Sequence, residues 1–567
     1  MSDKTFADIT RELIGPGSPL EIEICTIRGV PTQCWKSLPV TVPQVLKYCE
    51  SFAERDYIVY EGERLTYAQT FERIRALASH LQEVCGVQKG DRVALAMRNY
   101  PEWIISFWAT LAIGAIIVPL NAWWKGQELG YGLRDSGSRV LLCDAERAYL
   151  LEGELTSSTN GIEHALVARS SQAQSLPLRA PFRSFEAALT QHAGRVPLSV
   201  PISPEDDATI FYTSGTTGQP KGALGTHRNL CANIGSTMFA RARALARGTR
   251  SSLPPTQQAA GLLSVPLFHV TGCHSALVAG SFNGNKLVMI HKWNPEHALE
   301  LIERERLTQF GGVPSMVWQV LESPDFKKRD TSSIATVSYG GAPAASELVK
   351  RIKEAFPRST ASNGYGLTET SALAISNIGL DYERKPDSVG VPVATCEVKI
   401  VAADGGELPP GSVGELWIKG PNVVKGYWGK PEATAQAFSD GYLHTGDVAR
   451  IDEEGFVYIL DRAKDMLIRG GENVYCVEVE DVLYSHPAVM DAAVIGVPHR
   501  VLGEEVGAIA QVAPGTHVTR DELRAFAGQR LAKFKVPTHI ELRSEPLPRN
   551  ANGKIMKRDL KRELGWT

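Results

Sequence analysis

One run of eleven residues constrains this chain more than any other: Tyr-Thr-Ser-Gly-Thr-Thr-Gly-Gln-Pro-Lys-Gly, at positions 212–222. It follows the apolar stretch Ala208–Phe211, which predicts a short buried strand. A loop this rich in Gly, Ser and Thr can turn its backbone N–H groups inward around an anion, and Lys221 adds a mobile positive charge. The order Pro-Lys-Gly differs from the Gly-Lys-Ser/Thr of a Walker A loop, and a flexible linker has no reason to end that way. The run therefore predicts a phosphate-binding loop.

The length and composition of the chain narrow the classes of protein to which it can belong. At 567 residues the chain is too long for one ordinary core, so we expect a large lobe and at least one further domain. A net charge of −3 without a long basic run argues against a nucleic-acid partner. Nine cysteines without a Cys-x-x-Cys pair are typical of reduced thiols, not of a zinc site or a disulfide framework. The N-terminus lacks an apolar signal core and the C-terminus lacks a peroxisomal address, so we expect a cytoplasmic protein.

Residues 103–120 carry no charged side chain and allow two interpretations. One is a membrane span. The other is a buried helix, a break at Gly114 and a strand over Ala115–Leu120. We favour the second, because the run is short for a span and lacks flanking basic anchors. No transmembrane segment is therefore expected.

The alternation of helix and strand patterns predicts the fold class of the first part of the chain. A helix over Phe71–Leu81, capped by Thr66, precedes apolar strands at Arg92–Met97 and Arg139–Cys143. This order is typical of a parallel sheet covered by helices on both faces. The Ser-rich residues 154–180 are interpreted as an irregular surface excursion.

The later part of the chain changes character. Residues 388–458 hold short strands between Gly and Pro turns, which predicts a small antiparallel sheet or barrel. Beyond it, strands at Ala492–Val497 and Ala508–Val512 indicate a compact α+β domain. We therefore predict an α/β protein. Its large N-terminal lobe, residues 1–462, holds parallel-rich sheets covered by helices. The lobe also contains the antiparallel subdomain. A hinge joins it to a small α+β C-terminal domain, residues 463–567.

The loop at 212–222 resembles the phosphate loop of adenylate-forming enzymes, which include acyl-CoA synthetases, luciferases and nonribosomal adenylation domains. Further motifs of this family follow in the family's order, over roughly residues 60–560. The resemblance implies that ATP is cleaved to AMP and pyrophosphate while a carboxylate is activated. It assigns ATP contacts to the loop residues Thr213, Ser214, Gly215, Thr216, Thr217, Gly218 and Lys221.

Two more stretches match the family's adenine and magnesium sites. The predicted strand Thr336–Gly340 runs into a glycine turn that lets a flat ring approach closely, and the matching shelf is Gly341, Ala342 and Pro343. The motif at 363–370 supplies the rest of that site: Asn363, Gly364, Tyr365, Gly366 and Thr368. Its glycines are expected to bend the chain, and Tyr365 offers a face for stacking. Glu369 is a hard oxygen ligand suited to Mg²⁺, and the resemblance adds Thr213 to that metal site.

The acyl pocket of the family corresponds to the turn Val265–Gly272, and the residues assigned to it are Phe268, His269, Gly272 and Gly340. Enzymes that adenylate amino acids commonly carry an Asp at this turn. This chain has no carboxylate there, so the resemblance implies an acid without a free amine. His269 either lines or gates the pocket, or it is a structural histidine beside an aromatic ring, and the sequence leaves both open.

The last motifs concern the ribose, the hinge and the second domain. Asp447 can accept both ribose hydroxyls, and Arg462 can reach the ribose or the α-phosphate. The resemblance makes Lys464 the pivot of an inter-domain hinge. The residues assigned to coenzyme A are Gly470, Gly471 and Glu472. Lys554 follows a glycine turn and matches the lysine that enters the family's active site for adenylation, so the predicted catalytic set is Lys554, Lys221, Glu369 and Thr213.

These assignments imply a two-step, AMP-forming acid–thiol ligase that uses ATP, Mg²⁺ and coenzyme A. A medium- or long-chain fatty acid suits the apolar turn at 268–272, and an aryl acid stays open. An enzyme that loads a carrier protein stays open as well. A noncatalytic nucleotide-binding protein would be expected to lack Lys554, Glu369 or Lys221, and all three are present. The sequence does not determine the oligomeric state, and it leaves a homodimer open.

Overall fold

The computed structural model describes residues 4–156, 161–170, 180–213, 219–254, 256–341, 346–513, 515–550 and 553–566. Its first large sheet has eight strands in the order β21-β11-β10-β6-β5-β7-β8-β9. The strands from β10 to β9 run parallel, and β11 and β21 add an antiparallel edge beside β10. Their bounds are β5 Arg92–Ala96, β6 Ile116–Pro119, β7 Val140–Asp144, β8 His164–Ala168, β9 Phe182–Ser184, β10 Asp207–Thr213, β11 Lys221–Thr226 and β21 Gly426–Tyr427.

A second sheet has nine strands in the order β18-β17-β16-β15-β14-β12-β13-β3-β4. Its central strands, β16 to β3, are parallel, and antiparallel strands flank them at both edges. The bounds are β3 Asp56–Tyr60, β4 Glu63–Thr66, β12 Ala260–Leu263, β13 Lys286–Met289, β14 Gln309–Gly312, β15 Thr336–Gly340, β16 Thr360–Tyr365, β17 Ile375–Ile378 and β18 Val391–Pro392.

Helices fill the space between the two sheets and cover their outer faces. Buried residues of α3 and α4 belong to one apolar cluster with residues of β3, β5 and β13, so these two helices join the sheets. The helical bounds in the lobe are α2 Val42–Cys49, α3 Tyr67–Glu83, α4 Pro101–Ala112, α5 Gly126–Ser136, α6 Ala145–Thr156, α7 Phe185–Gln191, α8 His227–Ala246, α9 Ala279–Phe282, α10 Pro295–Arg304, α11 Pro314–Glu322, α12 Ser346–Ala355 and α13 Leu380–Arg384. Short turns of other helix types are η1 Glu50–Phe52, η3 Thr271–Val278, η4 Phe326–Lys328 and η5 Thr368–Thr370.

The apolar run at 103–120 forms a buried helix and a strand, as predicted. Every residue of α4 from Pro101 to Leu111 is buried, which is expected of a helix that is apolar all round and lies in the core of a large protein. Gly114 then adopts a φ of 74°, and the chain turns into β6. Among the described residues, no helix has the length and apolarity that a bilayer crossing requires.

The antiparallel subdomain and the C-terminal elements also follow the prediction. Five antiparallel strands form the subdomain: β19 Glu397–Val401, β20 Val413–Lys419, β22 Phe438–Ser439, β23 Tyr442–Ile451 and β24 Val457–Arg462, with α14 Pro431–Ala437 beside them. The last sheet comprises β25 Leu467–Arg469, β26 Glu472–Val474, β27 Val489–His499, β28 Gly503–Val512 and β29 His539–Arg543. It is accompanied by α15 Cys476–Tyr484, α16 Arg520–Gly528, η6 Lys533–Lys535 and α17 Lys557–Glu563.

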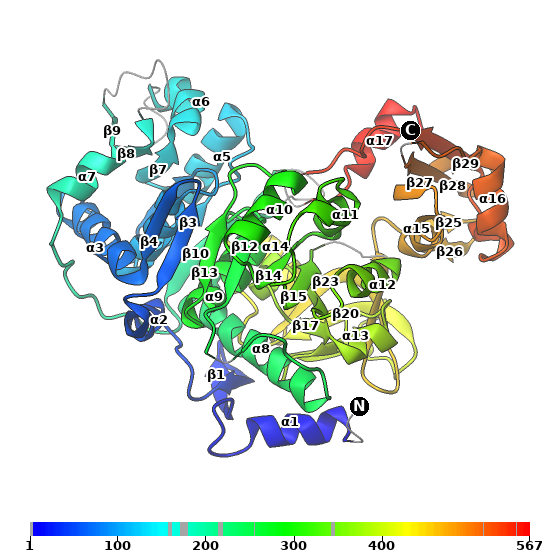
Figure 1. The fold of residues 1–567 in the computed structure, drawn as a ribbon, viewed down its shortest axis with the longest axis horizontal. Coiled ribbons are helices and arrows are strands. Elements are labelled where there is room, and N and C mark those ends of the chain that lie inside the picture. The colour runs from blue at the N-terminus through cyan, green and yellow to red at the C-terminus, as the bar shows by residue number, and fades with distance from the viewer. Residues whose placement is uncertain are drawn as a thin grey trace.

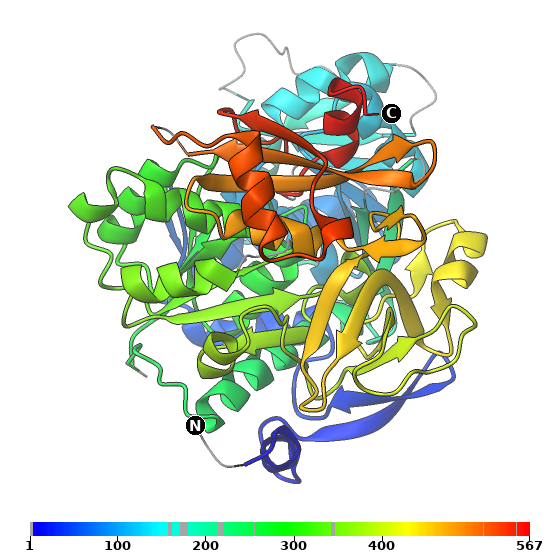
Figure 2. The same cartoon turned by 90° about the vertical axis from the view of Figure 1, so that its right-hand side faces the viewer.

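The C-terminal elements have apolar clusters of their own and stand beside the large lobe. Figure 1 shows them, in orange and red, at one side of the lobe, and Figure 2 views that side face on. The predicted fold class, an α/β lobe with a small antiparallel subdomain and a small α+β C-terminal part, is therefore confirmed. The boundary between residues 462 and 463 stays a prediction.

The interpretation of residues 154–180 as an irregular excursion was wrong in part. Residues His164–Ala168 form β8, which pairs in parallel with β7, and Ala165 to Ala168 are buried. Four small or branched apolar residues in a row are enough for a short strand inside a parallel sheet, where both faces are covered. The surrounding Ser-rich sequence concealed this signal.

An N-terminal hairpin packs against the long helix α8. Its strands are β1 Ile22–Ile27 and β2 Val30–Trp35, and it is preceded by α1 Phe6–Ile14. The indole Nε1 of Trp35 donates to the carbonyl oxygen of Ala232 at 3.1 Å, and the ring lies over Gly235 of α8. A Cβ at Gly235 would lie 2.4 Å from Trp35 Nε1, so the missing side chain makes room for the indole.

We expect Gly235→Ala to lower the midpoint of denaturant unfolding, although alanine favours a helix. The clash with the indole costs about 1–3 kcal/mol of overpacking, which exceeds the gain of about 0.5–1 kcal/mol in helix propensity. Gly153→Ala is the matched control: Gly153 lies in α6, and an added Cβ there meets no heavy atom within 4 Å. This control should raise the midpoint, and equal behaviour of the two variants would contradict the packing argument.

Candidate active site

The predicted phosphate loop leaves β10 and returns as β11. Thr213, the last residue of β10, lies opposite Lys221, the first residue of β11, and its hydroxyl donates to the Lys221 carbonyl oxygen at 3.4 Å. The loop residues Ser214, Gly215, Thr216, Thr217 and Gly218 lie outside the described residues. The strand–loop–strand setting predicted from Ala208–Phe211 is present.

Glu369 lies in η5 close to the same hairpin. Its Oε1 accepts a hydrogen bond from the hydroxyl of Tyr427 at 2.8 Å, and the Lys221 Nζ stands over the ring of Tyr427, 5.1 Å from its centre. Tyr427 thus contacts both the carboxylate predicted to bind Mg²⁺ and the lysine predicted to bind phosphate. Sequence reasoning missed this residue.

Asp447 is buried in β23, with an exposed fraction of 2%. Its Oδ2 accepts from the Tyr365 hydroxyl at 2.6 Å, and its Oδ1 lies 2.9 Å from the Arg462 Nε in an ion pair. Within the described part of the chain, Oδ1 accepts no hydrogen bond. The carboxylate therefore joins the second sheet to β24 and keeps unused accepting capacity.

Glycines at or next to the ends of β15 and β16 allow close approaches between backbones. A Cβ at Gly340 would lie 2.4 Å from the carbonyl oxygen of Gly364, and one at Gly366 would lie 1.5 Å from that of Ala372. The expectation that both glycines of this motif bend the chain was wrong for Gly364, because Asn363, Gly364 and Tyr365 all lie in the straight strand β16.

The remaining residues of the adenine motif flank this strand. Gly341 follows β15 with a φ of 76°, and Thr368 begins η5. Ala342 and Pro343 lie outside the described residues. The structure therefore brings the described members of the motif to one edge of the second sheet, where β15 and β16 end.

The predicted acyl residues lie where the chain enters the π-helix η3, a form that is frequent at functional sites. Phe268 is buried and stands edge-on to the ring of His269. The His269 Nε2 is buried without a hydrogen-bond partner among the described residues. Burial, together with the nearby charge of Lys554, lowers the pKa of His269 to about 3, so the ring is neutral at physiological pH. Gly272 permits a tight turn, because a Cβ there would lie 2.4 Å from the Pro266 carbonyl oxygen.

Lys554 reaches this site from the far end of the chain. Its pKa is lowered to about 8, mainly by burial and then by the charge of Arg462, while the carboxylates of Asp447 and Glu369 act in the opposite direction. Its backbone N–H donates to the Asn550 Oδ1 at 3.0 Å. The preceding Gly553 has a φ of 71°, and a Cβ there would lie 2.8 Å from the side chain of Val313, which follows β14 of the lobe.

The predicted hinge residue Lys464 is close enough to Lys554 for its charge to help lower the pKa of that lysine. Lys464 is exposed in the turn between β24 and β25, where the N–H groups of Asp465 and Met466 donate to the Arg462 carbonyl oxygen. Gly470 and Gly471, with φ values of 60° and 89°, form the turn of the hairpin β25–β26, as two left-handed residues do in a tight hairpin. These glycines and Glu472 are exposed.

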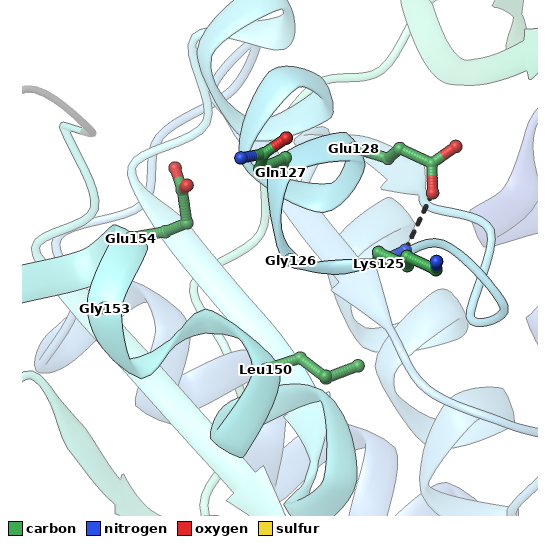
Figure 3. Close-up of a pocket in the computed structure, with 7 residues that line it drawn as sticks. All are labelled: Lys125, Gly126, Gln127, Glu128, Leu150, Gly153 and Glu154. Atoms are coloured by element: carbon green, nitrogen blue, oxygen red, sulfur yellow. Dashed lines mark hydrogen bonds between the residues drawn. The ribbon is translucent and has the colours of Figure 1, made fainter.

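A hollow of about 420 Å³ opens elsewhere on the lobe, between the start of α5 and the end of α6. Figure 3 shows its lining, in which Glu128 accepts from the backbone N–H of Lys125 and Leu150 points across the opening. None of the predicted site residues line it. No cluster of three or more His, Cys, Asp or Glu side chains that could bind a metal occurs among the described residues. The predicted Mg²⁺ site, with a single carboxylate, needs the phosphates of its substrate to complete it.

Most of the chain matches two known protein-family models. Residues 46–428 match the model of the AMP-binding enzyme family, and residues 478–554 match that of the AMP-binding enzyme C-terminal domain. The chain belongs to this family. The predicted membership of the adenylate-forming enzymes, in the acyl-CoA synthetase branch, is therefore confirmed.

Named relatives extend over nearly the whole chain. A feruloyl-CoA synthase of Amycolatopsis sp is 36% identical over 507 residues, which cover 89% of this chain and 95% of that protein. A long-chain-fatty-acid–CoA ligase of Bacillus subtilis (strain 168) is 34% identical over 535 residues, covering 90% and 92%. The crystal structure of the anthranilate CoA ligase AuaEII in complex with anthranoyl-AMP superimposes with a TM-score of 0.83 at 26% identity, covering 93% of this chain and 98% of that one.

The sequence carried weak signals for the residues that were missed. Val313 follows Gly311-Gly312 at the end of β14, a pattern like the one that drew attention to Gly340 and Gly341. Tyr427 follows Gly426 in a stretch of Gly and Pro turns. Nothing local in either segment indicates its distant partner, because Tyr427 meets Glu369 only through the fold.

We expect Gly553→Ala to slow the formation of acyl-adenylate more than the formation of thioester from a preformed acyl-adenylate. The added Cβ collides with Val313 and moves Lys554 out of the site, whereas the second reaction does not need Lys554 there. Gly515→Ala is the control, since it shares the strain of a φ of 76° but meets no atom within 4 Å. Separate assays of the two half-reactions test this, and equal slowing of both would contradict it.

Proposed function

We propose that the protein is an ATP-dependent acid–CoA ligase that forms an acyl-adenylate and then transfers the acyl group to coenzyme A. One observation supports this most: Lys554, from the C-terminal part, reaches the charges of Arg462, Asp447 and Glu369 beside His269. A buried amine among phosphate- and ribose-binding groups suits a reaction in which negative charge moves between a carboxylate and a phosphate. The family and its relatives are consistent with this activity.

In the first half-reaction, an oxygen of the substrate carboxylate attacks the α-phosphorus of ATP and pyrophosphate leaves. Lys554 stabilises the charge shared by the carboxylate and the α-phosphate, while Lys221 holds the departing phosphates. The unused accepting capacity of Asp447 suits the ribose hydroxyls, and Arg462 pairs with that carboxylate. Tyr365 is fixed through its hydroxyl, which leaves its ring available to the adenine.

The residues at η5 and the end of β10 fit a magnesium ion. Glu369 supplies a carboxylate oxygen and Thr213 a hydroxyl, the hard ligands that Mg²⁺ prefers beside phosphate oxygens. When bound, the ion would neutralise charge on the phosphates of ATP. Among the described residues, the Tyr427 hydroxyl donates to Oε1 of Glu369, which leaves Oε2 for the ion.

For the second half-reaction we propose that the chain turns about Lys464 and brings the hairpin of Gly470, Gly471 and Glu472 into the site. That hairpin is exposed while Lys554 lies inside, which is the arrangement expected of the first half-reaction. Slim glycines would let the pantetheine arm pass over the backbone. The thiol would then attack the acyl carbonyl carbon, and AMP would leave.

The acid that suits the site best is a medium- or long-chain fatty acid. The buried Phe268 offers an apolar surface, and the turn at 265–272 carries no carboxylate for an α-amine. An aryl acid is the second candidate, favoured by the edge-on pair of Phe268 and His269, which suits a further ring, and by the feruloyl-CoA synthase at 36% identity.

A panel of acids tests this proposal. Octanoate, palmitate, ferulate and anthranilate should be assayed for AMP release with and without coenzyme A, and thioester should be measured directly. We expect AMP and acyl-CoA in equal amounts, with kcat/KM highest for a fatty acid. A higher kcat/KM for ferulate would select the aryl acid. Pyrophosphate exchange without any coenzyme A thioester would contradict the ligase and favour a carrier protein as acceptor.

The lowered pKa of Lys554 predicts an alkaline limit for adenylation. The amine is charged below its pKa of about 8 and becomes neutral as the pH rises through that value, so kcat/KM for ATP–pyrophosphate exchange should fall about tenfold for each further pH unit. His269, neutral above pH of about 3, should not produce an acid limb.

Lys554→Arg separates this titration from other causes. Arginine stays protonated throughout the range, so the variant should be slower but should lose the decline above pH 8. Lys535→Arg is the control, because Lys535 lies in the same C-terminal part and pairs with Glu478 at 2.7 Å. The control should keep the wild-type profile. An unchanged profile in Lys554→Arg would assign the alkaline limb to another group.

A further inference from the structure

Residues 420–428, which we call the strap, hold two separate parts of the active site together. Within the strap, β21 pairs with β11, and the Trp428 N–H donates to the Gly222 carbonyl oxygen at 2.8 Å. The Val424 N–H donates to the Glu369 carbonyl oxygen at 3.0 Å, and the Asn422 Nδ2 donates to that of Thr370 at 2.9 Å. The strap is therefore bonded to the strand that begins at Lys221 and to the helical turn that carries Glu369.

Tyr427 is the strap residue whose side chain joins the two functional groups. It lies opposite Ala223 in the β11–β21 ladder, so Lys221 is its diagonal neighbour on the same face. The Lys221 Nζ stands over its ring at 5.1 Å, and its hydroxyl donates to the Glu369 Oε1 at 2.8 Å. One rigid side chain thus contacts both an ammonium from β11 and a carboxylate from η5.

Tyr427 contacts Glu369 in the way that supporting residues contact the carboxylates that bind a metal in other proteins. A carboxylate that binds a metal is usually oriented by a hydrogen bond to its other oxygen, and loss of such a bond typically weakens metal binding by tenfold or more. The Tyr427 hydroxyl donates such a bond to the Glu369 Oε1. The ring face holds the Lys221 ammonium by a cation–π interaction, which is weaker than the hydrogen bond.

We propose that Tyr427 is a positioning residue that orients Glu369 toward Mg²⁺ through its hydroxyl and Lys221 toward the phosphates of ATP through its ring. This inference rests on the proposed function, because it assumes that ATP and Mg²⁺ bind between the two groups. The two contacts use different parts of one side chain, so they can be removed one at a time.

The chain contains a matched control. Tyr442, in the antiparallel subdomain, donates its hydroxyl to the Glu397 Oε2 at 3.0 Å, and the Lys399 Nζ stands over its ring at 4.2 Å. The same three groups therefore occur in the same relation, and none of Tyr442, Glu397 and Lys399 is a predicted ATP or Mg²⁺ ligand, although Tyr442 shares β23 with Asp447. Tyr442→Phe reports the general cost of losing such a hydroxyl.

The experiment measures ATP binding to the full-length protein by calorimetry, without a carboxylic acid, while MgCl₂ is varied. For Tyr427→Phe we expect the Mg²⁺ concentration that supports half of the binding to rise about tenfold, with less than a threefold change in ATP affinity at saturating Mg²⁺. Tyr427→Leu, which also loses the ring, should weaken ATP binding at saturating Mg²⁺ by a further threefold or so. Tyr442→Phe should match the wild type in both measurements.

A double variant separates orientation of Glu369 from general damage. If Tyr427 acts through Glu369, Tyr427→Phe should cause no further change in the Mg²⁺ titration of a Glu369→Ala protein. Three results would overturn the inference: an unchanged titration in Tyr427→Phe, an equal shift in Tyr442→Phe, or additive effects in the double variant. If the wild type itself binds no ATP, the proposed function fails and the inference fails with it, a result distinct from the other three.

Discussion

The buried carboxylate of Asp447 is the interaction on which the rest of the site depends. It accepts from Tyr365 at the end of the second sheet and pairs with Arg462 at the end of β24, so it joins the parallel lobe to the strand that leads toward the C-terminal part. A buried carboxylate must be compensated by donors or opposite charge; here the donor Tyr365 lies 82 positions away, and the charge of Arg462 comes from the neighbouring strand β24. Because each partner is held by a strand, the charge is presented at a defined place, beside the amine of Lys554.

Lys554 shows why a second domain is useful to such a site. Its amine sits among Asp447, Glu369 and Arg462 only because the preceding turn, with Gly553 in a left-handed conformation, lies against Val313 of the lobe. A contact between two domains can be broken more easily than a contact within a core, since it buries less apolar surface. In the proposed two-step reaction, such a contact would let the cation be supplied for the first step and withdrawn for the second, while the lobe keeps its predicted nucleotide-binding groups in place.

Much of the fold and of the candidate site could be predicted from local sequence. Apolar runs between helical patterns predicted the parallel sheets, and the break at Gly114 separated α4 from β6. The glycine-rich loop after β10 and the motifs around Glu369, Asp447 and Lys554 indicated the family, which the match over residues 46–428 confirmed. These features were readable because turns, glycines and strand ends impose requirements on the residues that form them. The strand β8 was missed because a Ser-rich neighbourhood hid a short apolar run.

By itself, the sequence determined most elements of the fold, the family and the types of side chain that we expect to meet the substrates. Only the tertiary structure decided which of these side chains touch. The hydroxyl of Tyr427 meets Glu369 across 58 positions of sequence, Tyr365 meets Asp447 across 82, and Gly553 lies against Val313 of another domain. Such contacts leave little local trace, because a tyrosine that orients a carboxylate and one that fills a core look alike in sequence. What distinguishes them is the order of strands in the sheets, which places β21 beside β11.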